Sequence, residues 1–354
     1  MSFDAKEFLP AAVLAKVTDV RVTDPERSKR AARKRKRRSR STIIAGNTYS
    51  FPTLTKDGRL NILAADHPAR RVTRVGDDLL RMADRREYMS RILRVLMSDA
   101  VDGLLATMDI LEDLLIIDDL LKESNGRGFL DEKVLLASFN RGGLLGSVWE
   151  IDDPNSGPTA ASCREWGLDG AKILLRICDD EKDSLKTLLD TVKAITELNA
   201  VGLPMFLESL PVVREDDGRH GVYRIVKTAE ALARTAGAAA ALGDSARYLW
   251  LKLPYCENYE MVANATTLPI LLLGGEPVGD ATPFLRELHA GLRAGPNVRG
   301  ALVGRNILYP GDDDPLAAIE AVGGIIHHGW TVEHAIDNQA AHRGRDMDWL
   351  KRIA

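Results

Sequence analysis

Eight short apolar runs, each followed by a longer stretch of mixed polarity, recur between residues 58 and 304. The runs are 60–66, 102–108, 133–139, 170–176, 203–209, 248–252, 268–274 and 299–304. They are spaced by roughly 25 to 45 residues, the scale of strand–helix units. The intervening segments 187–198 and 223–233 carry apolar residues at helical spacing. Eight such units predict an α/β fold, the (β/α)8 barrel. A Rossmann fold is disfavoured because no G-x-G-x-x-G follows the first run.

The repeat divides the chain into an N-terminal extension, 1–57, and an expected barrel with a helical tail, 58–354. The extension carries a basic run, RSKRAARKRKRRSR, at 27–40. This run is a candidate nucleic-acid or polyanion patch. It is also a candidate solvated helix that pairs with acidic surface on its own chain or on a neighbouring subunit. A third interpretation has its arginines reaching over the active site. The net charge of −3 and the isolation of the run favour the second interpretation.

The composition excludes several classes of protein. The chain has 354 residues, of which 45% are hydrophobic and 28% charged, as in soluble globular proteins. No apolar run reaches the roughly 18 residues of a membrane span, and the N-terminus lacks the pattern of a secretory signal, so we expect a cytoplasmic protein. Three cysteines without CxxC spacing argue against a disulfide framework and a zinc site, and we expect neither metal nor cofactor. Aromatic residues at 5% argue against base-stacking nucleic-acid modules.

Lys252 lies inside the sixth apolar run, in the segment RYLWLKLPY at 247–255. A lysine within a buried strand must lose its charge, find a partner or take part in chemistry. A desolvated amine with a lowered pKa is what Schiff-base formation on a carbonyl requires. Alternatively, Lys252 stands at the end of the strand and extends its amine to water. Taken alone, the run favours this alternative, because lysine is seldom fully buried unless it is paired.

Polar residues at the ends of other runs change that balance, because barrel active sites lie at the carboxyl ends of the strands. The fourth run contains Lys172, which can share an interior layer with Lys252, and two neighbouring ammonium groups lower the pKa of one of them. Glu208, on the fifth run, is a candidate proton shuttle. Asp66, at the end of the first run, is a candidate for orienting a lysine or a substrate hydroxyl. Each of the four also has the plain interpretation of a salt bridge at the rim, and His67 that of a capping or packing residue.

Glycines and arginines after the last runs predict a phosphate site. Gly274 and Gly275 follow the seventh run, and Gly304 and Arg305 follow the eighth, where barrel enzymes commonly bind phosphate. Further cations stand near other strand ends, and one phosphate does not require so many. These cations are Arg70, Arg71, Arg141 and Arg176. They predict a second anion on the substrate, a phosphate, carboxylate or sulfonate, unless they pair with nearby carboxylates of the chain.

Over roughly residues 58–312 these motifs resemble those of class I aldolases of the DhnA, DeoC and LacD type. The segments AKILLRICDD, PMFLE and WLKLPY are similar to the strand-four lysine, strand-five glutamate and Schiff-base motifs of tagatose-bisphosphate aldolases, and ALVGRNI to their phosphate segment. The resemblance implies that Lys252 forms the Schiff base with Lys172 as a supporting cation. It implies Glu208 as acid/base, Asp66 as the strand-one carboxylate, and Arg305 with Gly275 as the phosphate site. The chain departs from the fructose-bisphosphate branch at Leu210–Pro211, where that branch has a Tyr-Pro.

Within this group the chain most resembles an actinobacterial barrel family found with myo-inositol catabolism genes. That resemblance implies a small phosphorylated sugar substrate, 5-dehydro-2-deoxy-D-gluconate 6-phosphate, cleaved to dihydroxyacetone phosphate and malonate semialdehyde. Other candidates are an aldolase for fructose or tagatose bisphosphate, sulfofructose phosphate or deoxyribose phosphate, and an acyl transfer on a phosphorylated diketone. A catalytically inactive barrel that binds polyanions is the candidate from another class. We expect a homo-oligomer, with neither nucleic acid nor membrane as a partner.

Overall fold

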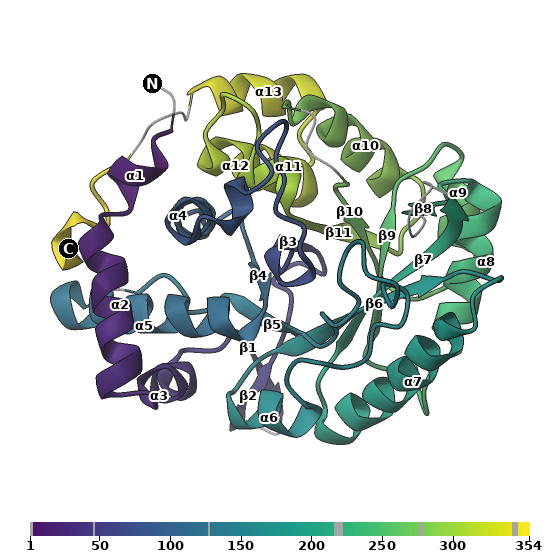
Figure 1. The fold of residues 1–354 in the computed structure, drawn as a ribbon, viewed down its shortest axis with the longest axis horizontal. Coiled ribbons are helices and arrows are strands. Elements are labelled where there is room, and N and C mark those ends of the chain that lie inside the picture. Colours follow the sequence, from purple (N-terminus) through teal and green to yellow (C-terminus); the bar gives the residue numbers. More distant parts are fainter. Residues whose placement is uncertain (1–2, 45–46, 127, 216–221, 276–278, 342–345) are drawn as a thin grey trace.

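The barrel expected from the sequence repeat is present and closed. The structure is a computed structural model that describes residues 3–44, 47–126, 128–215, 222–275, 279–341 and 346–354. Its parallel strands are β3 (Leu60–Ala65), β4 (Gly103–Ala106), β5 (Val134–Ser138), β6 (Gly170–Ile177), β7 (Met205–Glu215), β9 (Leu249–Pro254), β10 (Ile270–Leu273) and β11 (Val298–Val303). Each pairs in parallel with the next, and β11 pairs with β3 to close the ring. The predicted (β/α)8 fold is therefore confirmed (Figure 1).

Helices surround this ring (Figure 1). They are α4 (Arg85–Leu96), α5 (Met108–Asn125), α6 (Ala160–Glu165), α7 (Asp183–Val201), α8 (Ala229–Ala240), α9 (Tyr259–Asn264), α10 (Thr282–Arg293), α11 (Arg305–Leu308), α12 (Pro315–His328) and α13 (Val332–Ala341). Several begin at a side-chain cap, as at Asp84, Thr228 and Asp314, and α5 and α7 end at left-handed glycines. None of the described helices combines the length and apolar character that crossing a lipid bilayer requires.

Successive side chains of each strand point alternately into and out of the barrel, and the inward-pointing ones fill its interior with an apolar cluster. This interior cluster consists of Leu60, Ile62, Ala64, Leu105, Val134, Leu136, Phe206, Leu271 and Leu302. Leu54, from the N-terminal extension, and Trp250 pack against it. Because every second residue of a strand faces the same side, the inward position of Phe206 directs Glu208 to the same face, nearer the carboxyl end. The polar residues predicted for the site thus lie above an apolar layer.

The N-terminal extension folds onto the barrel. Its elements are α1 (Ala5–Phe8), α2 (Ala11–Thr23), α3 (Arg27–Lys34), β1 (Ser39–Ile44) and β2 (Asn47–Pro52), of which β1 and β2 form an antiparallel pair. The helices α1–α3 line one side of the molecule, and both ends of the chain lie there (Figure 1). The terminal 3₁₀ helix η3 (Lys351–Ile353) is tied to α2 by a hydrogen bond of 3.0 Å from Nζ of Lys16 to the carbonyl oxygen of Ile353.

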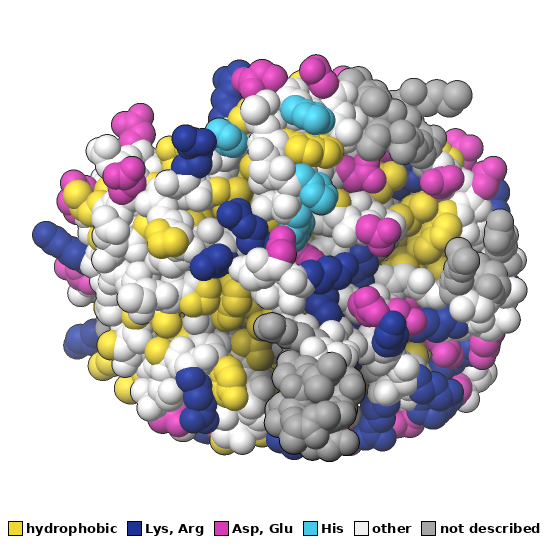
Figure 2. All heavy atoms as spheres, turned by 180° about the vertical axis from the view of Figure 1, so that it is seen from behind, with side chains coloured by type: hydrophobic (Ala, Val, Ile, Leu, Met, Phe, Trp, Pro, Cys, Tyr) yellow, Lys and Arg dark blue, Asp and Glu magenta, His cyan; other side chains and the backbone are white. Residues whose placement is uncertain are grey.

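Acidic side chains of the same chain neutralise most of the basic run. Arg27 pairs with Asp119 and Glu123, and Lys29 and Arg33 pair with Glu165. Further along, Arg35 and Arg37 pair with Asp169, and Arg38 pairs with Asp102. In the view from behind, basic and acidic side chains are interspersed over the surface (Figure 2). The pairing with its own chain matches the second interpretation, but a solvated helix over the whole run does not, because α3 ends at Lys34 and Arg35 and Arg38 are buried.

Two segments that the strand–helix repeat does not predict stand over the carboxyl ends of the strands. One is a hairpin in which β7 continues to Glu215 and pairs in antiparallel fashion with β8 (Val222–Ile225). The other is the loop 140–158 between β5 and α6. A small apolar cluster joins them to the barrel, and its members are Ile151, Leu174, Cys178, Leu210, Val212 and Leu273. Because Leu174 and Leu273 belong to β6 and β10, this cluster brings the loop and the hairpin close to the mouth of the barrel.

Candidate active site

Lys172 and Lys252 both contact one carboxylate oxygen, Oε2 of Glu208. The Nζ atom of Lys172 lies 2.6 Å from this oxygen, and the Nζ atom of Lys252 lies 3.0 Å from it. The lysines stand on β6 and β9, and Glu208 stands on β7 between them. All three side chains are buried, with residue exposures of 1%, 5% and 9%. Lys252 is therefore buried and paired, and its amine does not extend to water.

Asp66, at the end of β3, completes a lysine–carboxylate cluster of Lys172, Lys252, Glu208 and Asp66. Its Oδ2 atom lies 3.5 Å from Nζ of Lys172 and accepts a hydrogen bond of 3.0 Å from Oγ of Ser138. The same oxygen forms an ion pair with the guanidinium of Arg141. Sequence reasoning missed Ser138. The alternation along β5 was the signal for it, because Leu136 faces the interior and Ser138 lies two residues beyond.

Burial and neighbouring charges set the protonation states of the cluster. Burial lowers the pKa of Lys172 well below its ordinary value, and the nearby guanidinium of Arg141 lowers it further. Burial also lowers the pKa of Lys252, although the carboxylate of Glu208 acts in the opposite direction. Burial alone would raise the pKa of Glu208, but the two ammonium groups outweigh it and lower that pKa. The cluster thus holds an ionised carboxylate beside amines that release their protons more readily than free lysine.

Of the glycines predicted for a phosphate site, Gly275 lies in an open turn after β10, whereas Gly304, after β11, packs tightly against His67 and Ala64. Gly275 has a φ of +72°, which side chains rarely adopt, and Nζ of Lys227 lies 4.0 Å from the position its Cβ would take. The side-chain amide of Asn306 donates a hydrogen bond to the carbonyl oxygen of Gly274, which links the two turns. Arg305 is the first residue of α11, directly after Gly304. The backbone at Gly275 is not covered by a side chain of its own, and Arg305 and Lys227 are nearby cations. Such a turn suits the binding of an anionic group.

His67 packs against the eighth strand at this side of the mouth. A Cβ at Gly304 would stand 2.4 Å from Cε1 of His67 and 2.6 Å from the carbonyl oxygen of Ala64, so the ring occupies the space that glycine leaves. Burial lowers the pKa of His67 well below its ordinary value, and the charges of Arg305 and Lys252 act in the same direction. The imidazole is therefore neutral at pH 7. Its side chain forms no capping hydrogen bond, so packing is the interpretation that matches the structure.

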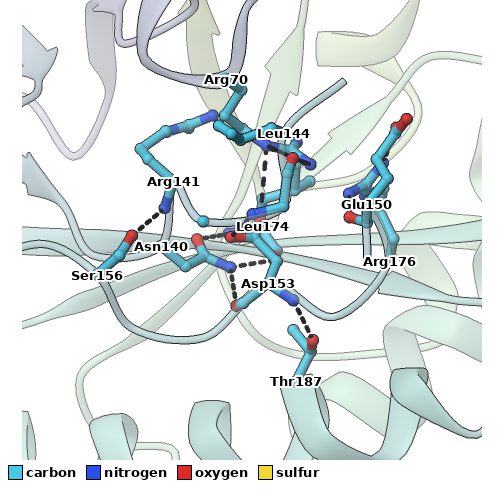
Figure 3. A network of polar contacts seen from close by, with 12 residues as sticks. Arg70, Asn140, Arg141, Leu144, Glu150, Asp153, Ser156, Leu174, Arg176 and Thr187 are labelled. Atoms are coloured by element: carbon cyan, nitrogen blue, oxygen red, sulfur yellow. Dashed lines mark hydrogen bonds and ion pairs between the residues drawn. The ribbon is translucent and has the colours of Figure 1, made fainter. Parts of the chain in front are cut away.

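Arg176 is part of a polar network that supports the loop 140–158 (Figure 3). Its Nη1 atom lies 2.5 Å from Oε1 of Glu150, and its guanidinium also contacts the carbonyl oxygen of Glu150. Asn140 donates to the carbonyl oxygens of Leu174, at 2.6 Å, and Asp153, at 3.2 Å. Arg176 was predicted to bind substrate, but here its charge is balanced by Glu150. That partner lies 26 residues away, and no local pattern indicated it.

The cluster can perform chemistry on a carbonyl compound. A buried amine with a lowered pKa is a nucleophile, and an adjacent carboxylate can transfer protons. Among the described residues, no group of three or more His, Cys, Asp and Glu side chains is arranged to hold a metal ion. All three cysteines are buried and without a disulfide partner.

The fold and the cluster define a (β/α)8-barrel protein with a centre of two lysines and a glutamate at the carboxyl end of its sheet. Residues 58–323 match the Cgl0159-like family, and the chain belongs to this family. It is similar to the crystal structure of Cgl0159 from Corynebacterium glutamicum (Brevibacterium flavum), with 33% sequence identity and a TM-score of 0.79. That similarity covers 91% of this chain and 99% of the other.

More distant solved structures share the fold. A fructose-bisphosphate aldolase from Slackia heliotrinireducens is 15% identical with a TM-score of 0.60, and the match covers 97% of each chain. A Schiff-base-forming fructose-1,6-bisphosphate aldolase is 21% identical with a TM-score of 0.54, and the match covers 76% of this chain and 95% of the other. No curated protein matches the chain.

Proposed function

We propose that this protein is a class I aldolase that forms a Schiff base between Lys252 and a ketose phosphate. The observation that carries the proposal is the pair of buried amines on Oε2 of Glu208, at 2.6 and 3.0 Å. Such a centre favours a neutral amine near neutral pH, which attacks a carbonyl carbon. The fold shared with a Schiff-base-forming fructose-1,6-bisphosphate aldolase supports the same class of reaction.

The cluster suggests a sequence of steps. Lys252 adds to the substrate ketone, and loss of water gives an iminium that withdraws electrons. Glu208, directly or through water, takes the proton from the hydroxyl two carbons from the iminium carbon. The bond between the carbon adjacent to the iminium carbon and the carbon that bears this hydroxyl then breaks, which releases an aldehyde and leaves an enamine on Lys252. Protonation of the enamine and hydrolysis release dihydroxyacetone phosphate and restore the amine. Lys172 stabilises the carboxylate of Glu208 throughout.

The best candidate substrate is 5-dehydro-2-deoxy-D-gluconate 6-phosphate, with malonate semialdehyde as the aldehyde product. It carries one phosphate, for which Arg305 and Gly275 are the proposed site, and one carboxylate. Fructose or tagatose bisphosphate, sulfofructose phosphate and deoxyribose phosphate are the competing substrates, and a substrate panel separates them. A role in myo-inositol catabolism stays a prediction from the sequence. Polyanion binding is not favoured, because the acids of the chain itself neutralise most of the basic run.

Reductive trapping tests the proposal. The protein is incubated with dihydroxyacetone phosphate and sodium borohydride, and the modified peptide is identified by mass spectrometry. We expect a reduced adduct on Lys252 in the wild type and none in Lys252→Met. An adduct on Lys172 would preserve the reaction class and exchange the roles of the two lysines. A folded protein that forms no adduct with any ketose phosphate in the panel would refute the proposed function.

A further inference from the structure

Four arginines besides Arg305 lie within or just after the carboxyl ends of strands, and most of them do not contact the lysine–carboxylate cluster. The four are Arg70, Arg71, Arg141 and Arg176. Arg70 donates to the carbonyl oxygen of Gly143 at 2.9 and 2.6 Å, and Glu150 balances Arg176 (Figure 3). Arg71 is exposed to solvent. Of these four, Arg141 is the one that contacts a member of the cluster within the described part of the chain.

The position of Arg141 is defined by both its backbone and its side chain. The backbone N–H donates a hydrogen bond of 2.8 Å to Oγ of Ser156, which anchors the start of the loop 140–158 (Figure 3). The guanidinium Nε donates to Oγ of Ser138 at 2.8 Å, and Nη2 contacts Oδ2 of Asp66. Burial lowers the pKa of Arg141 to about 10, so the group remains a cation at neutral pH. The loop therefore presents a fixed positive charge to the interior of the mouth.

The ion pair between Arg141 and Asp66 can be exchanged at small cost. Without Arg141, Oδ2 of Asp66 still accepts from Ser138 at 3.0 Å and lies 3.5 Å from the ammonium of Lys172. Breaking a buried ion pair is usually costly because it leaves one buried charge without a partner. If a second anion binds the guanidinium of Arg141, Asp66 keeps its other partners and this cost does not arise. The contacts of Arg70 and Arg176 within the loop offer no such exchange, because their partners support its fold.

The order of strands puts Arg141 across the mouth from the proposed phosphate turn. Arg141 follows β5, and Gly274 and Gly275 follow β10. In the closed sheet β10 is opposite β5, because the same number of strands separates them in both directions. Lys172, Glu208 and Lys252 stand on β6, β7 and β9, along one of the two arcs between them. A substrate with phosphate at the β10 side therefore extends past these three residues and presents its other end to Arg141.

We infer that Arg141 selects substrates whose aldehyde half ends in a carboxylate, by exchanging Asp66 for that group. This inference rests on the proposed function and assigns its specificity. A guanidinium binds a planar carboxylate through two parallel hydrogen bonds, which a methyl or hydroxyl group at the same place cannot accept. An aldehyde without the negative charge leaves Arg141 on Asp66 and gains no contact with it.

Aldol synthesis with a matched pair of aldehydes tests the inference. Dihydroxyacetone phosphate is combined with malonate semialdehyde or with propanal, which has the same chain length and a methyl group in place of the carboxylate. The wild type is expected to prefer malonate semialdehyde in kcat/KM by about 10- to 100-fold, the effect of one charge-assisted contact. Arg141→Met is expected to lose this preference, with kcat/KM falling more for malonate semialdehyde than for propanal. Arg71→Gln, at the same rim, is expected to keep the wild-type preference.

Borohydride trapping of dihydroxyacetone phosphate is the second measurement, because this substrate lacks the carboxylate half. Arg141→Met is expected to form the same adduct as the wild type, which shows that it is folded and active in its first step. If the wild type forms no adduct, the proposed function fails. If Arg141→Met forms the adduct and still prefers malonate semialdehyde by the wild-type ratio, the assignment of Arg141 is overturned. Loss of the preference in Arg71→Gln would overturn it as well.

Discussion

Lys172 and Lys252 stand on strands that do not pair with each other, yet both amines lie on the same oxygen of Glu208. One carboxylate thus serves two buried ammonium groups, so a proton leaving either lysine weakens the stabilisation of the carboxylate. The three groups titrate as a unit, and each apparent pKa belongs to the cluster rather than to a single residue. This coupling makes Glu208 the residue whose replacement is most informative.

Glu208→Gln is expected to lower kcat by about 10²- to 10⁴-fold, the usual worth of a positioned acid/base group. The amide is close to isosteric and its oxygen still accepts a hydrogen bond, so the fold should persist. Removing the negative charge also removes the interaction that opposes the lowering of the Lys252 pKa. The onset of borohydride trapping should therefore move to lower pH than in the wild type. Trapping onset at unchanged or higher pH, or wild-type kcat, would contradict this role for Glu208.

Gly304→Ala is expected to destabilise the protein by about 1–3 kcal/mol, as overpacking of a tight site does. The new methyl group would stand 2.4 Å from Cε1 of His67 and 2.6 Å from the carbonyl oxygen of Ala64. Gly237→Ala is the matched control, because a Cβ there meets nothing within 4 Å and Gly237 lies inside α8. That change should stabilise by about 0.5–1 kcal/mol through helix propensity. Urea unfolding measures both, and equal effects would argue against the tight contact.

His327 contributes a pH-dependent stabilisation. Its Nδ1 lies 2.8 Å from Oδ2 of Asp57, and its Nε2 lies 3.0 Å from Oδ2 of Asp102. Burial alone would lower the pKa of His327, but these two carboxylates outweigh burial and raise it. A folded pKa above the unfolded value gives stabilisation that is complete below about pH 6.5 and is lost as the pH rises through the folded pKa. The difference in unfolding free energy between the wild type and His327→Gln should therefore shrink with rising pH, and a constant difference would contradict the ion pairs.

Arg35→Met tests whether the basic run stabilises the fold. The guanidinium of Arg35 lies 2.7 Å from Oδ2 of Asp169 and 2.5 Å from the carbonyl oxygen of Lys133, and it is buried. We expect a loss of about 2–4 kcal/mol in unfolding free energy, because a buried charge-assisted contact is removed. Lys34→Met, which removes the adjacent exposed cation, should change stability by less than about 0.5 kcal/mol. If both variants keep wild-type stability while polyanion binding falls, the run is a binding surface.

The strands and the inward-facing residues were predictable from the sequence, because they depend on local patterns. Apolar runs at the spacing of strand–helix units predicted the closed barrel. Period-two alternation from Phe206 placed Glu208 on the inner face. Lysines inside apolar runs are unusual enough to single out Lys172 and Lys252, since burying a charge requires a partner or a lowered pKa. These inferences use residues that are neighbours in the chain.

The partners of the charged groups were decided only by the tertiary structure. Arg176 meets Glu150, Arg141 meets Asp66, and the basic run meets acids on α5, α6 and the strand starts, all from distant parts of the chain. The extension of β7 into a hairpin with β8 was also outside the repeat. The sequence shows that a buried arginine needs a carboxylate as its partner. The path of loops such as 140–158 determines which carboxylate lies within a few ångströms of it. The sequence therefore determined the barrel and its candidate amines, and the folding of loops over its mouth decided which carboxylates the arginines there contact.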